Sequence, residues 1–480
     1  MYRYFFKFVD RNKSYFYFMK KLISGILLSL LLSNTLYAKQ HSSNVPPDEQ
    51  WYCQITFANN MGPFNVILYF TYEDSTSFTA HSSPNADKRI FGNMKATMGR
   101  IMKKLPKKGV FMSITDGAIF KGQGNDSLLG IIHIPMIGSM DLKAVKTSDT
   151  IIGSLSNETE VLGSLNGTKS PKGFRQDYQK INERIIDTLE AYIYNPDLLR
   201  SQQWKRFNKK LDKVSKRALD DLEYFSGFGL HSQKLPFSHL NLFLFAQSPD
   251  QAAESDEKFL FLKELTPETA YLNVTSFGGS AKEMDSIFET ILKNNYQDLI
   301  IDLRRNGGGG LESAIRFGAY LCDDTMNAGY FVTNKWYRHH HAGDSPDFSN
   351  IQVTTATTTA AFIRELKHSP GKQLIISPAE DTYKGNVIVL TSGKTASTCE
   401  PIVYALKKHK LATIVGQTTA GAMLSAVLFQ VYGKYYLFLP VADYYTSDSK
   451  RLDQVGVEPD VAVEAEKALD VAKQLLAVPD

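Results

Sequence analysis

Cysteine is scarce in this chain, where only Cys53, Cys322 and Cys399 occur among 480 residues. Three thiols form at most one disulfide and leave one thiol over, so neither a disulfide framework nor a zinc cluster is predicted. A strong charge of one sign is also missing, because 54 Lys and Arg stand against 50 Asp and Glu. This balance gives no indication of a nucleic-acid partner, and stability has to come from packing.

Long apolar runs are missing as well, and the one near the amino terminus is short. A pair of lysines precedes the apolar residues 22–32, and the small Ala38 follows at a cleavage position. This order is typical of a secretory signal, and the run is shorter than the ~20 residues that a membrane-spanning helix needs. We therefore expect a signal peptide over residues 1–38 whose true start is Met19, an exported mature chain that is periplasmic or secreted, and no stable membrane insertion after cleavage. A membrane anchor is the alternative.

The pattern of apolar residues changes twice along the mature chain. Residues 39–170 carry short alternating runs between turn residues, which predicts a β-rich N-terminal domain, a small sheet or barrel. Residues 171–254 predict a helical segment and linker, with two helices between residues 174 and 225, because apolar residues recur three and four apart. Residues 255–480 alternate strand and helix patterns, which indicates an α/β catalytic domain with a mainly parallel sheet.

The α/β region shows its elements most clearly. Strands are predicted at residues 271–276, 298–303, 387–391 and 412–415, and helices at residues 284–292, 311–321 and 401–408. The threonine-rich residues 353–359 predict a mobile loop.

Four consecutive glycines follow one of these strands. Gly307 to Gly310 precede a helix, and glycines there let backbone N–H groups approach a ligand and point at a negative oxygen. A phosphate loop needs Lys followed by Ser or Thr after its last glycine, and a dinucleotide fingerprint that starts at Gly307 needs Gly or Ala at position 312. Leu311 and Glu312 stand there instead. We therefore expect no nucleotide, and no cofactor or metal is predicted.

A second strand, turn and helix start place Ser397 where a side chain is presented to solvent beside unpaired N–H groups. Such a serine can be a nucleophile. The alternative is an ordinary helix cap, with Glu400 completing a capping box. The residues of this segment leave both interpretations open.

Four segments resemble, in this order, the tail-specific proteases, or carboxyl-terminal processing peptidases, and their tricorn-like and retinoid-binding-protein-like relatives. Residues 271–277 match the pattern Tyr-x-x-x-x-x-Phe, and residues 302–309 match Asp-Leu-Arg-x-Asn-x-Gly-Gly. Residues 395–400 match Thr-Ala-Ser-x-x-Glu, and residues 456–460 match Gly-Val-x-Pro-Asp. The resemblance covers roughly residues 271–463.

The resemblance implies a crotonase/ClpP-like α/β core in which Ser397 attacks a peptide carbonyl and forms an acyl-enzyme. It also implies that backbone N–H groups of Thr398 and of a glycine near Gly308 hold the oxyanion. The expected function is an exported serine peptidase that acts on peptide or protein substrates. A catalytically inactive binding protein of the same fold and an esterase are the alternatives.

The chain departs from the processing peptidases at their catalytic lysine. That lysine follows a Gly-x-x-Thr-x-Gly turn, matched here by residues 416–421, but Ala422 comes next. Lys394 lies close to the serine turn and is more typical of a solvated loop lysine. The processing peptidases also contain a peptide-binding PDZ module, which with ~90 residues is smaller than a usual domain. The stretch from His239 to Tyr271 is too short to hold it.

The tricorn-like branch uses a histidine base instead, and a Ser-His pair at Ser238 and His239 resembles the one in that branch. A neutral imidazole accepts a hydroxyl proton near pH 7, and a carboxylate holds its tautomer. The branch places this carboxylate just before the Gly-Val-x-Pro-Asp segment, where Asp453 stands. We therefore expect His239 to be the base, with Ser238 and Asp453 in support, and His231 is the rival in the same segment.

Overall fold

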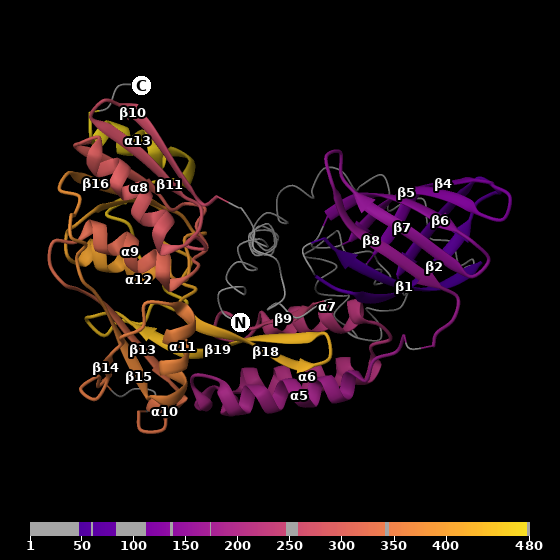
Figure 1. Ribbon diagram of the computed structural model, residues 1–480. Helices are drawn as coiled ribbons and strands as arrows, with labels where there is room; N and C mark the ends of the chain where they lie inside the picture. Colours follow the sequence, from indigo (N-terminus) through magenta and orange to yellow (C-terminus); the bar gives the residue numbers. More distant parts are fainter. Residues whose placement is uncertain are drawn as a thin grey trace.

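The computed structural model describes residues 48–58, 61–82, 112–134, 138–172, 174–245, 258–340 and 345–477. A barrel, a helical layer and an α/β body follow one another along the chain, and the helical layer lies in the lower middle of Figure 1, between the other two. The signal peptide predicted over residues 1–38 lies outside the described residues. Among those described, no helix is both long and apolar enough to cross a membrane.

The N-terminal strands form a closed barrel in which each strand pairs with the next and the last returns to the first. Burial alternates along the strands, so that Trp51, Phe70 and Leu155 are fully buried and fill the interior. The β-rich N-terminal region predicted from the turn-separated runs is therefore confirmed. The strands are β1 (Glu49–Phe57), β2 (Phe64–Tyr72), β3 (Ser77–Ser82), β4 (Ser113–Phe120), β5 (Asp126–Ile134), β6 (Gly138–Lys146), β7 (Thr150–Ser156) and β8 (Val161–Thr168).

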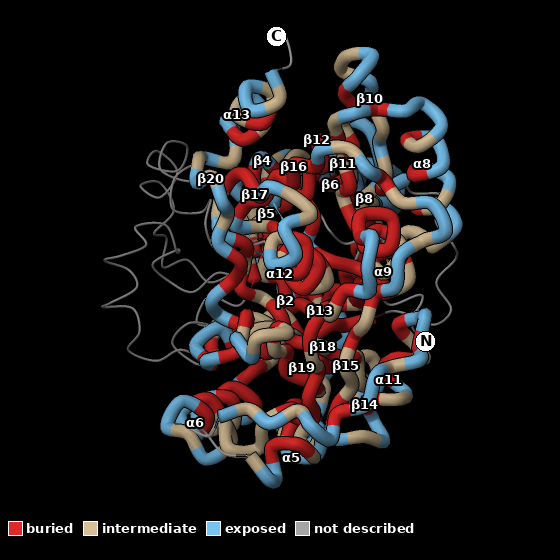
Figure 2. The backbone as a smooth tube through the Cα atoms, turned by 90° about the vertical axis from the view of Figure 1, so that its left-hand side faces the viewer, coloured by how far each residue is buried: buried red, intermediate tan, exposed pale blue. Residues whose placement is uncertain are grey.

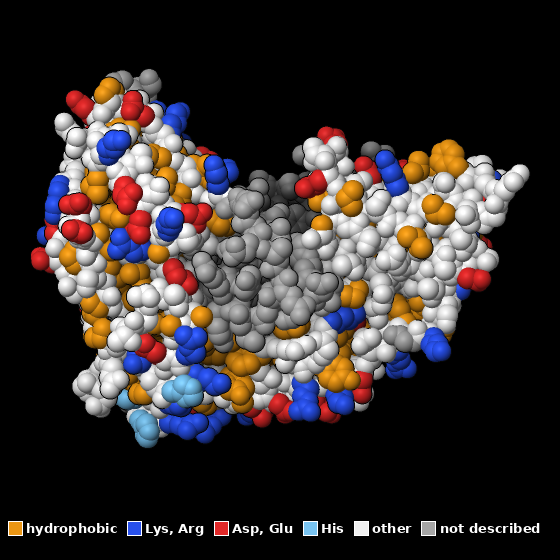
Figure 3. Space-filling model, viewed as in Figure 1, with side chains coloured by type: hydrophobic (Ala, Val, Ile, Leu, Met, Phe, Trp, Pro, Cys, Tyr) orange, Lys and Arg blue, Asp and Glu red, His pale blue; other side chains and the backbone are white. Residues whose placement is uncertain are grey.

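The helical layer consists of α5 (Tyr178–Tyr192), the 3-10 turn η4 (Pro196–Arg200), α6 (Gln202–Arg217) and α7 (Asp221–Ser232). Both α5 and α6 are amphipathic, and Figure 3 shows basic and acidic side chains along the lower edge where they lie. The prediction of two helices missed α7. This helix is buried on most of its sides and therefore lacks the 3.6-residue apolar period, although Asp220 caps it by accepting from the N–H of Glu223.

The first sheet of the α/β body has the order β10-β11-β12-β16-β17-β20 and is parallel except for β10. Apolar side chains of α8, α9 and α12 cover one face, and α13 covers the other. Figure 2 shows the buried strands between these helices. The elements are β10 (Leu260–Thr266), β11 (Thr269–Val274), α8 (Ala281–Lys293), β12 (Asp298–Asp302), α9 (Leu311–Leu321), β16 (Asn386–Thr391), α12 (Cys399–Lys408), β17 (Thr413–Gly416), β20 (Val461–Ala462), η6 (Ala465–Lys467) and α13 (Ala468–Leu475). The predicted α/β class is confirmed.

A second sheet, which the sequence patterns did not predict, has the order β14-β15-β13-β19-β18, and β9 also pairs with β19. Its strand β19 is buried along almost its whole length and so has no two-residue period. The hairpin of β18 and β19 reaches from the α/β body over α5 (Figure 1). The elements are β9 (Asn241–Leu244), β13 (Met326–Thr333), α10 (Asn334–Tyr337), β14 (Gln352–Val353), α11 (Thr359–His368), β15 (Gly371–Ile376), β18 (Leu424–Tyr432) and β19 (Tyr435–Tyr445).

The prediction of a mobile loop at residues 353–359 is wrong. The hydroxyls of Thr354 and Thr355 donate to the Glu365 carboxylate at 2.8 and 2.9 Å, and Thr358 caps α11 by accepting from the N–H of Ala361. These threonines are local hydrogen-bonding groups that fix the segment.

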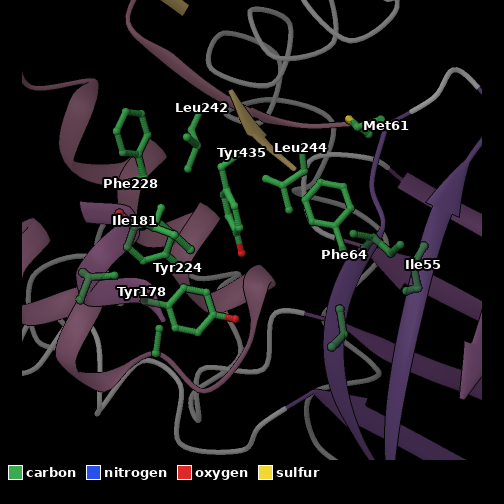
Figure 4. Packing of buried hydrophobic residues seen from close by; sticks show 14 of the residues in the cluster. Ile55, Met61, Phe64, Tyr178, Ile181, Tyr224, Phe228, Leu242, Leu244 and Tyr435 are labelled. Carbon is green, nitrogen blue, oxygen red and sulfur yellow. The ribbon is translucent and has the colours of Figure 1, made fainter. Parts of the chain in front are cut away.

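One apolar core continues from the barrel through the helices into the hairpin of the second sheet. Phe64 of β2 and Leu244 of β9 approach each other, and Tyr178, Tyr224 and Tyr435 lie beside them (Figure 4). The barrel is thus packed against the same strands that lead toward Ser238 and His239. The domain boundaries at residues 170 and 254 remain predictions.

Candidate active site

The two loops singled out in the sequence meet at one edge of the parallel sheet. Strands β12 and β16 are adjacent and parallel, so the segments that follow them emerge side by side. The Ala396 N–H donates to the Asn306 carbonyl at 3.1 Å, and the Thr395 hydroxyl donates to the Leu303 carbonyl at 2.8 Å. The glycine loop and the serine turn therefore form one hydrogen-bonded unit.

Ser397 has a left-handed backbone conformation, with a φ of 56°. A residue other than glycine keeps this conformation only where its surroundings enforce it, and such residues cluster at functional sites. The Ser397 N–H points at two acceptors, the Ala422 carbonyl at 3.1 Å and the Glu400 carboxylate at 3.2 Å. The N-cap of α12 is Thr398, and no side-chain hydrogen bond caps this helix. The Ser397 side chain thus does not cap α12, although Glu400 accepts from the Ser397 N–H as it would in a capping box.

Glu400 has a structural role that the sequence motif did not reveal. Its side chain is fully buried and accepts from the Thr419 hydroxyl at 2.7 Å and from the N–H groups of Gly421 and Ala422 at 2.7 and 2.9 Å. A carboxylate is the side chain that can accept so many donors at once. Glu400 thus fastens the turn at residues 419–422 to the backbone of Ser397 and holds both in place.

Gly308 lies directly against the serine. Its φ is +106°, and a Cβ at this position would lie 2.7 Å from the Cβ of Ser397 and 3.1 Å from the nitrogen of Thr398. Only glycine fits there. The Gly308 N–H, expected near the oxyanion, donates to the Asn306 side-chain oxygen at 2.9 Å in this structure. Among the described residues the Thr398 N–H has no hydrogen-bond acceptor.

Ser238, His239 and Asp453 come together although 215 residues separate Ser238 from Asp453. The Ser238 hydroxyl lies 2.6 Å from Nδ1 of His239 and donates to Oδ1 of Asp453 at 2.6 Å. His239 also has a left-handed backbone, with a φ of 63°, just before β9 begins. Burial raises the pKa of Asp453, while the hydrogen bond from Ser238 and the charge of Arg451 act to lower it.

The geometry favours one tautomer of His239. A hydroxyl has one proton, and an ionised Asp453 accepts the proton of Ser238. The contact of 2.6 Å between Ser238 Oγ and His239 Nδ1 must then take its proton from the ring. Neutral His239 therefore carries its proton on Nδ1, which leaves a lone pair on Nε2.

The turn at residues 420–422 links this group to the serine. The Gln454 N–H, one residue after Asp453, donates to the Gly421 carbonyl at 2.7 Å, and the Ser397 N–H donates to the next carbonyl, that of Ala422, at 3.1 Å. Ser397 and the residue that follows Asp453 are thus hydrogen-bonded to the same short turn. The ring of His239 lies 5.8 Å from that of Phe438 on β19, measured between centroids.

The rival candidates have different surroundings. His231 is buried near the end of α7, where burial lowers its pKa to about 4, and it lies on a helix that packs against α6, β2 and β9. Lys394 lies in the serine turn, where its N–H donates to the Ser392 hydroxyl at 3.1 Å. Within the described ranges no group of three or more His, Cys, Asp or Glu side chains is placed to hold a metal ion.

Comparisons with known proteins point to one family. Residues 268–463 match the model of peptidase family S41. Carboxyl-terminal-processing peptidase 2 of Arabidopsis thaliana is 26% identical over 196 residues, which cover 41% of this chain and 32% of that protein. A carboxy-terminal-processing protease of Bartonella bacilliformis is 25% identical over 211 residues, which cover 44% of this chain and 39% of the other. The alignments thus span between about a third and two-fifths of these relatives.

Among solved structures, a lipoprotein from Streptococcus agalactiae aligns with a TM-score of 0.45 and 15% identity, covering 63% of this chain and 96% of that one.

Proposed function

We propose, from the match of residues 268–463 to peptidase family S41, that the protein is a serine peptidase that hydrolyses peptide bonds through an acyl-enzyme on Ser397. One observation carries the proposal. Ser397 is held in a left-handed conformation by Glu400 and Gly308, beside a turn whose other side holds the hydrogen-bonded group of Ser238, His239 and Asp453.

In the proposed first step, Nε2 of His239 takes the proton of the Ser397 hydroxyl while Oγ bonds to the peptide carbonyl carbon. The Nδ1–H of the imidazolium donates to the Ser238 hydroxyl, and this hydroxyl donates to Asp453. The negative carboxylate thus stabilises the positive ring through one hydroxyl. The C–N bond then breaks, and the leaving amine takes the proton from Nε2. A water molecule activated by the same nitrogen releases the acyl group and restores Ser397.

We assign the first oxyanion donor to the Thr398 N–H, which follows the nucleophile directly. The second donor we propose is the Gly308 N–H, which in this structure donates to the Asn306 side-chain oxygen at 2.9 Å and would have to break this hydrogen bond first. Developing negative charge on the substrate oxygen is the better acceptor, because hydrogen bonds to ions are about twice as strong as those between neutral groups.

The substrates we propose are peptides or proteins outside the cytoplasm, in the periplasm or secreted. The basis is the signal-like amino terminus of the sequence together with the match to peptidase family S41. We infer from the fully buried interior of the barrel that it is a packed domain that flanks the site and does not enclose a small ligand.

A second candidate is a binding protein of the same fold that does not catalyse. Two observations favour it: Ala422 replaces the lysine of the processing peptidases, and the Gly308 N–H is engaged by Asn306. The two candidates differ in a directly measurable way, because only the peptidase has a reactive serine.

The deciding experiment is labelling of the purified protein with a fluorophosphonate, which reacts with an activated serine hydroxyl. Wild type should be labelled and should cleave an unstructured peptide, and Ser397→Ala should lose labelling and about 10⁶ in kcat. Ser449→Ala is the matched control, because Ser449 also has a left-handed backbone, with a φ of 67°, but lies in another turn. Labelling that persists in Ser397→Ala assigns the nucleophile elsewhere. A folded wild type that binds peptide without labelling or cleavage establishes the binding protein.

A further inference from the structure

Arg451 joins the site to a second buried carboxylate. Its Nη2 donates to Oδ2 of Asp453 at 3.3 Å and to the Tyr194 hydroxyl at 3.0 Å, and its Nε donates to Oδ2 of Asp443 at 2.7 Å. The side chains of both aspartates are 0% exposed, whereas that of Arg451 is 31% exposed. Asp453 thus has Ser238 on one oxygen and Arg451 on the other.

The loop that carries Arg451 is fixed. Arg451 pairs with Tyr445 of β19 in an isolated bridge, and the N–H of Thr446 donates to the Lys450 carbonyl at 2.9 Å. Asp448 in the same loop accepts from the hydroxyls of Tyr404 and Thr446 at 2.6 and 2.8 Å. The guanidinium is therefore held in place by its backbone as well as by its ion pairs.

Charged and titratable groups face Asp453 from several elements. Ser238 approaches from the segment before β9, Arg451 from its own loop, Asp443 from β19 and Tyr194 from the segment after α5. Beyond Asp443 lie the hydroxyls of Tyr337 and Tyr445, of which Tyr337 donates to Asp443 at 2.6 Å. Burial raises the pKa of both aspartates, and the charge of Arg451 acts against this rise at both.

The charge state of Asp453 decides which way the Ser238 hydroxyl points. An ionised Asp453 accepts the hydroxyl proton, and His239 must then carry its own proton on Nδ1. A protonated Asp453 donates to Ser238 instead, which frees the Ser238 proton to point at Nδ1. His239 then carries its proton on Nε2 and cannot take one from Ser397.

We propose that Arg451 is a positioning residue of the reaction: by keeping Asp453 ionised it sets the direction of the Ser238 hydroxyl and hence the tautomer of His239. It acts through three groups and touches no substrate. This inference rests on the proposed function of the site.

The test is the pH dependence of kcat/KM in Arg451→Gln. A nearby cation lowers the pKa of a carboxyl group, so the removal of Arg451 raises the pKa of Asp453. The ionised form needed for catalysis then appears only at higher pH. The acid limb of the profile should move to higher pH, with a loss of kcat/KM at pH 6 that shrinks toward pH 9. Arg451→Lys, which keeps the charge, should recover part of the loss.

Two controls separate this effect from a structural one. Arg316→Gln breaks another Arg–Asp pair whose arginine is similarly exposed, since the side chain of Arg316 is 35% exposed and bonds to Asp285 at 2.6 Å. Its pH profile should match wild type. In an Asp453→Asn background Arg451→Gln should no longer move the acid limb, because no carboxyl remains to titrate. A profile of Arg451→Gln that overlays wild type, or a shift that persists in the Asp453→Asn background, overturns the proposal.

A readout without turnover distinguishes this inference from the proposed function. In Ser397→Ala protein, ¹⁵N shifts of the His239 ring, assigned by comparison with His239→Gln, report the tautomer directly. We expect the Nδ1–H form, and Arg451→Gln should convert it to the Nε2–H form at pH 6. An unchanged ring spectrum contradicts the role of Arg451. Failure of the proposed function would instead appear as full peptide cleavage by Ser397→Ala.

Discussion

Two buried aspartates in this protein have nearly the same surroundings and different consequences. Asp221, at the start of α7, pairs with Lys434 and accepts from the Asn65 N–H at 2.7 Å and the Tyr178 hydroxyl at 2.8 Å, and the Tyr435 hydroxyl bonds to it as well. Asp453 similarly combines one cation with a neutral hydroxyl.

The two aspartates differ in what their hydrogen-bond partners contact in turn. The partners of Asp221 lie in the barrel, in α5 and in the hairpin of β18 and β19, so the carboxylate fastens three parts of the fold together. The partner of Asp453, Ser238, also contacts the imidazole of His239, a side chain that can accept a proton. We therefore expect the ion pair at Asp221 to contribute to stability and the ion pair at Asp453 to contribute to catalysis.

The substitution with the largest expected effect is Asp453→Asn, which tests whether this aspartate acts in catalysis. Arg451 should draw the amide oxygen to its own side, which turns the amide nitrogen toward Ser238 and reverses the direction of its hydroxyl. His239 is then held in the wrong tautomer, and kcat should fall by about 10⁴, as expected when a base is misprotonated. Peptide cleavage under single-turnover conditions measures the loss.

The melting temperature of Asp453→Asn should stay close to wild type, since the side chain keeps its size and Arg451 keeps its ion pair with Asp443. Asp285→Asn is the matched control, because Asp285 also pairs with an arginine but lies on α8. A drop in activity below tenfold in folded Asp453→Asn would mean that this carboxylate is structural, like Asp221.

A substitution in the cluster around Asp221 should lower the stability of the protein and leave its turnover unchanged. Lys434→Met leaves the buried Asp221 without its cation and removes the donor to the Pro63 carbonyl at 2.6 Å. Loss of one partner of a buried ion pair costs about 3–5 kcal/mol of unfolding free energy. Urea denaturation measures this change, and kcat per folded molecule should remain that of wild type.

Lys121→Met is the control for the substitution in the cluster around Asp221. Its ion pair with Asp126 is exposed, with 62% of the Lys121 side chain accessible, and such pairs contribute about 0–1 kcal/mol. If Lys434→Met unfolds at the same urea concentration as this control, the Asp221 cluster does not hold the barrel to the helices.

Much of the α/β body could be predicted because its apolar patterns are local. The predicted strands and helices at residues 298–303, 311–321 and 401–408 differ from β12, α9 and α12 by at most two residues at either end. The antiparallel strand β19 and the helix α7 could not be found in this way, since burial on several sides removes the periodicity that identifies an element.

For the site, the sequence motifs identified Ser397 and Glu400 but not how they act together. Three of the four donors to Glu400 come from residues 419–422, which reach it only after folding, as Ser238 reaches Asp453. The assignments of Ser397, His239 and Asp453 as catalytic residues remain predictions. No sequence pattern pointed to Arg451, because its partners are brought to it by the second sheet.

The smallest expected effect within the catalytic group is that of Ser238→Ala. The substitution removes a neutral hydroxyl that bridges 2.6 Å to Nδ1 of His239 and 2.6 Å to Asp453, and a water molecule can take its place. A hydrogen bond to a charged group contributes about 1.5–3 kcal/mol, which corresponds to a loss of roughly 10- to 100-fold in kcat. The loss should therefore be smaller than in Asp453→Asn, since alanine does not impose the wrong proton direction. Activity equal to wild type would show that Asp453 acts on His239 without Ser238, and a loss as large as that of Asp453→Asn would show that no water replaces the hydroxyl.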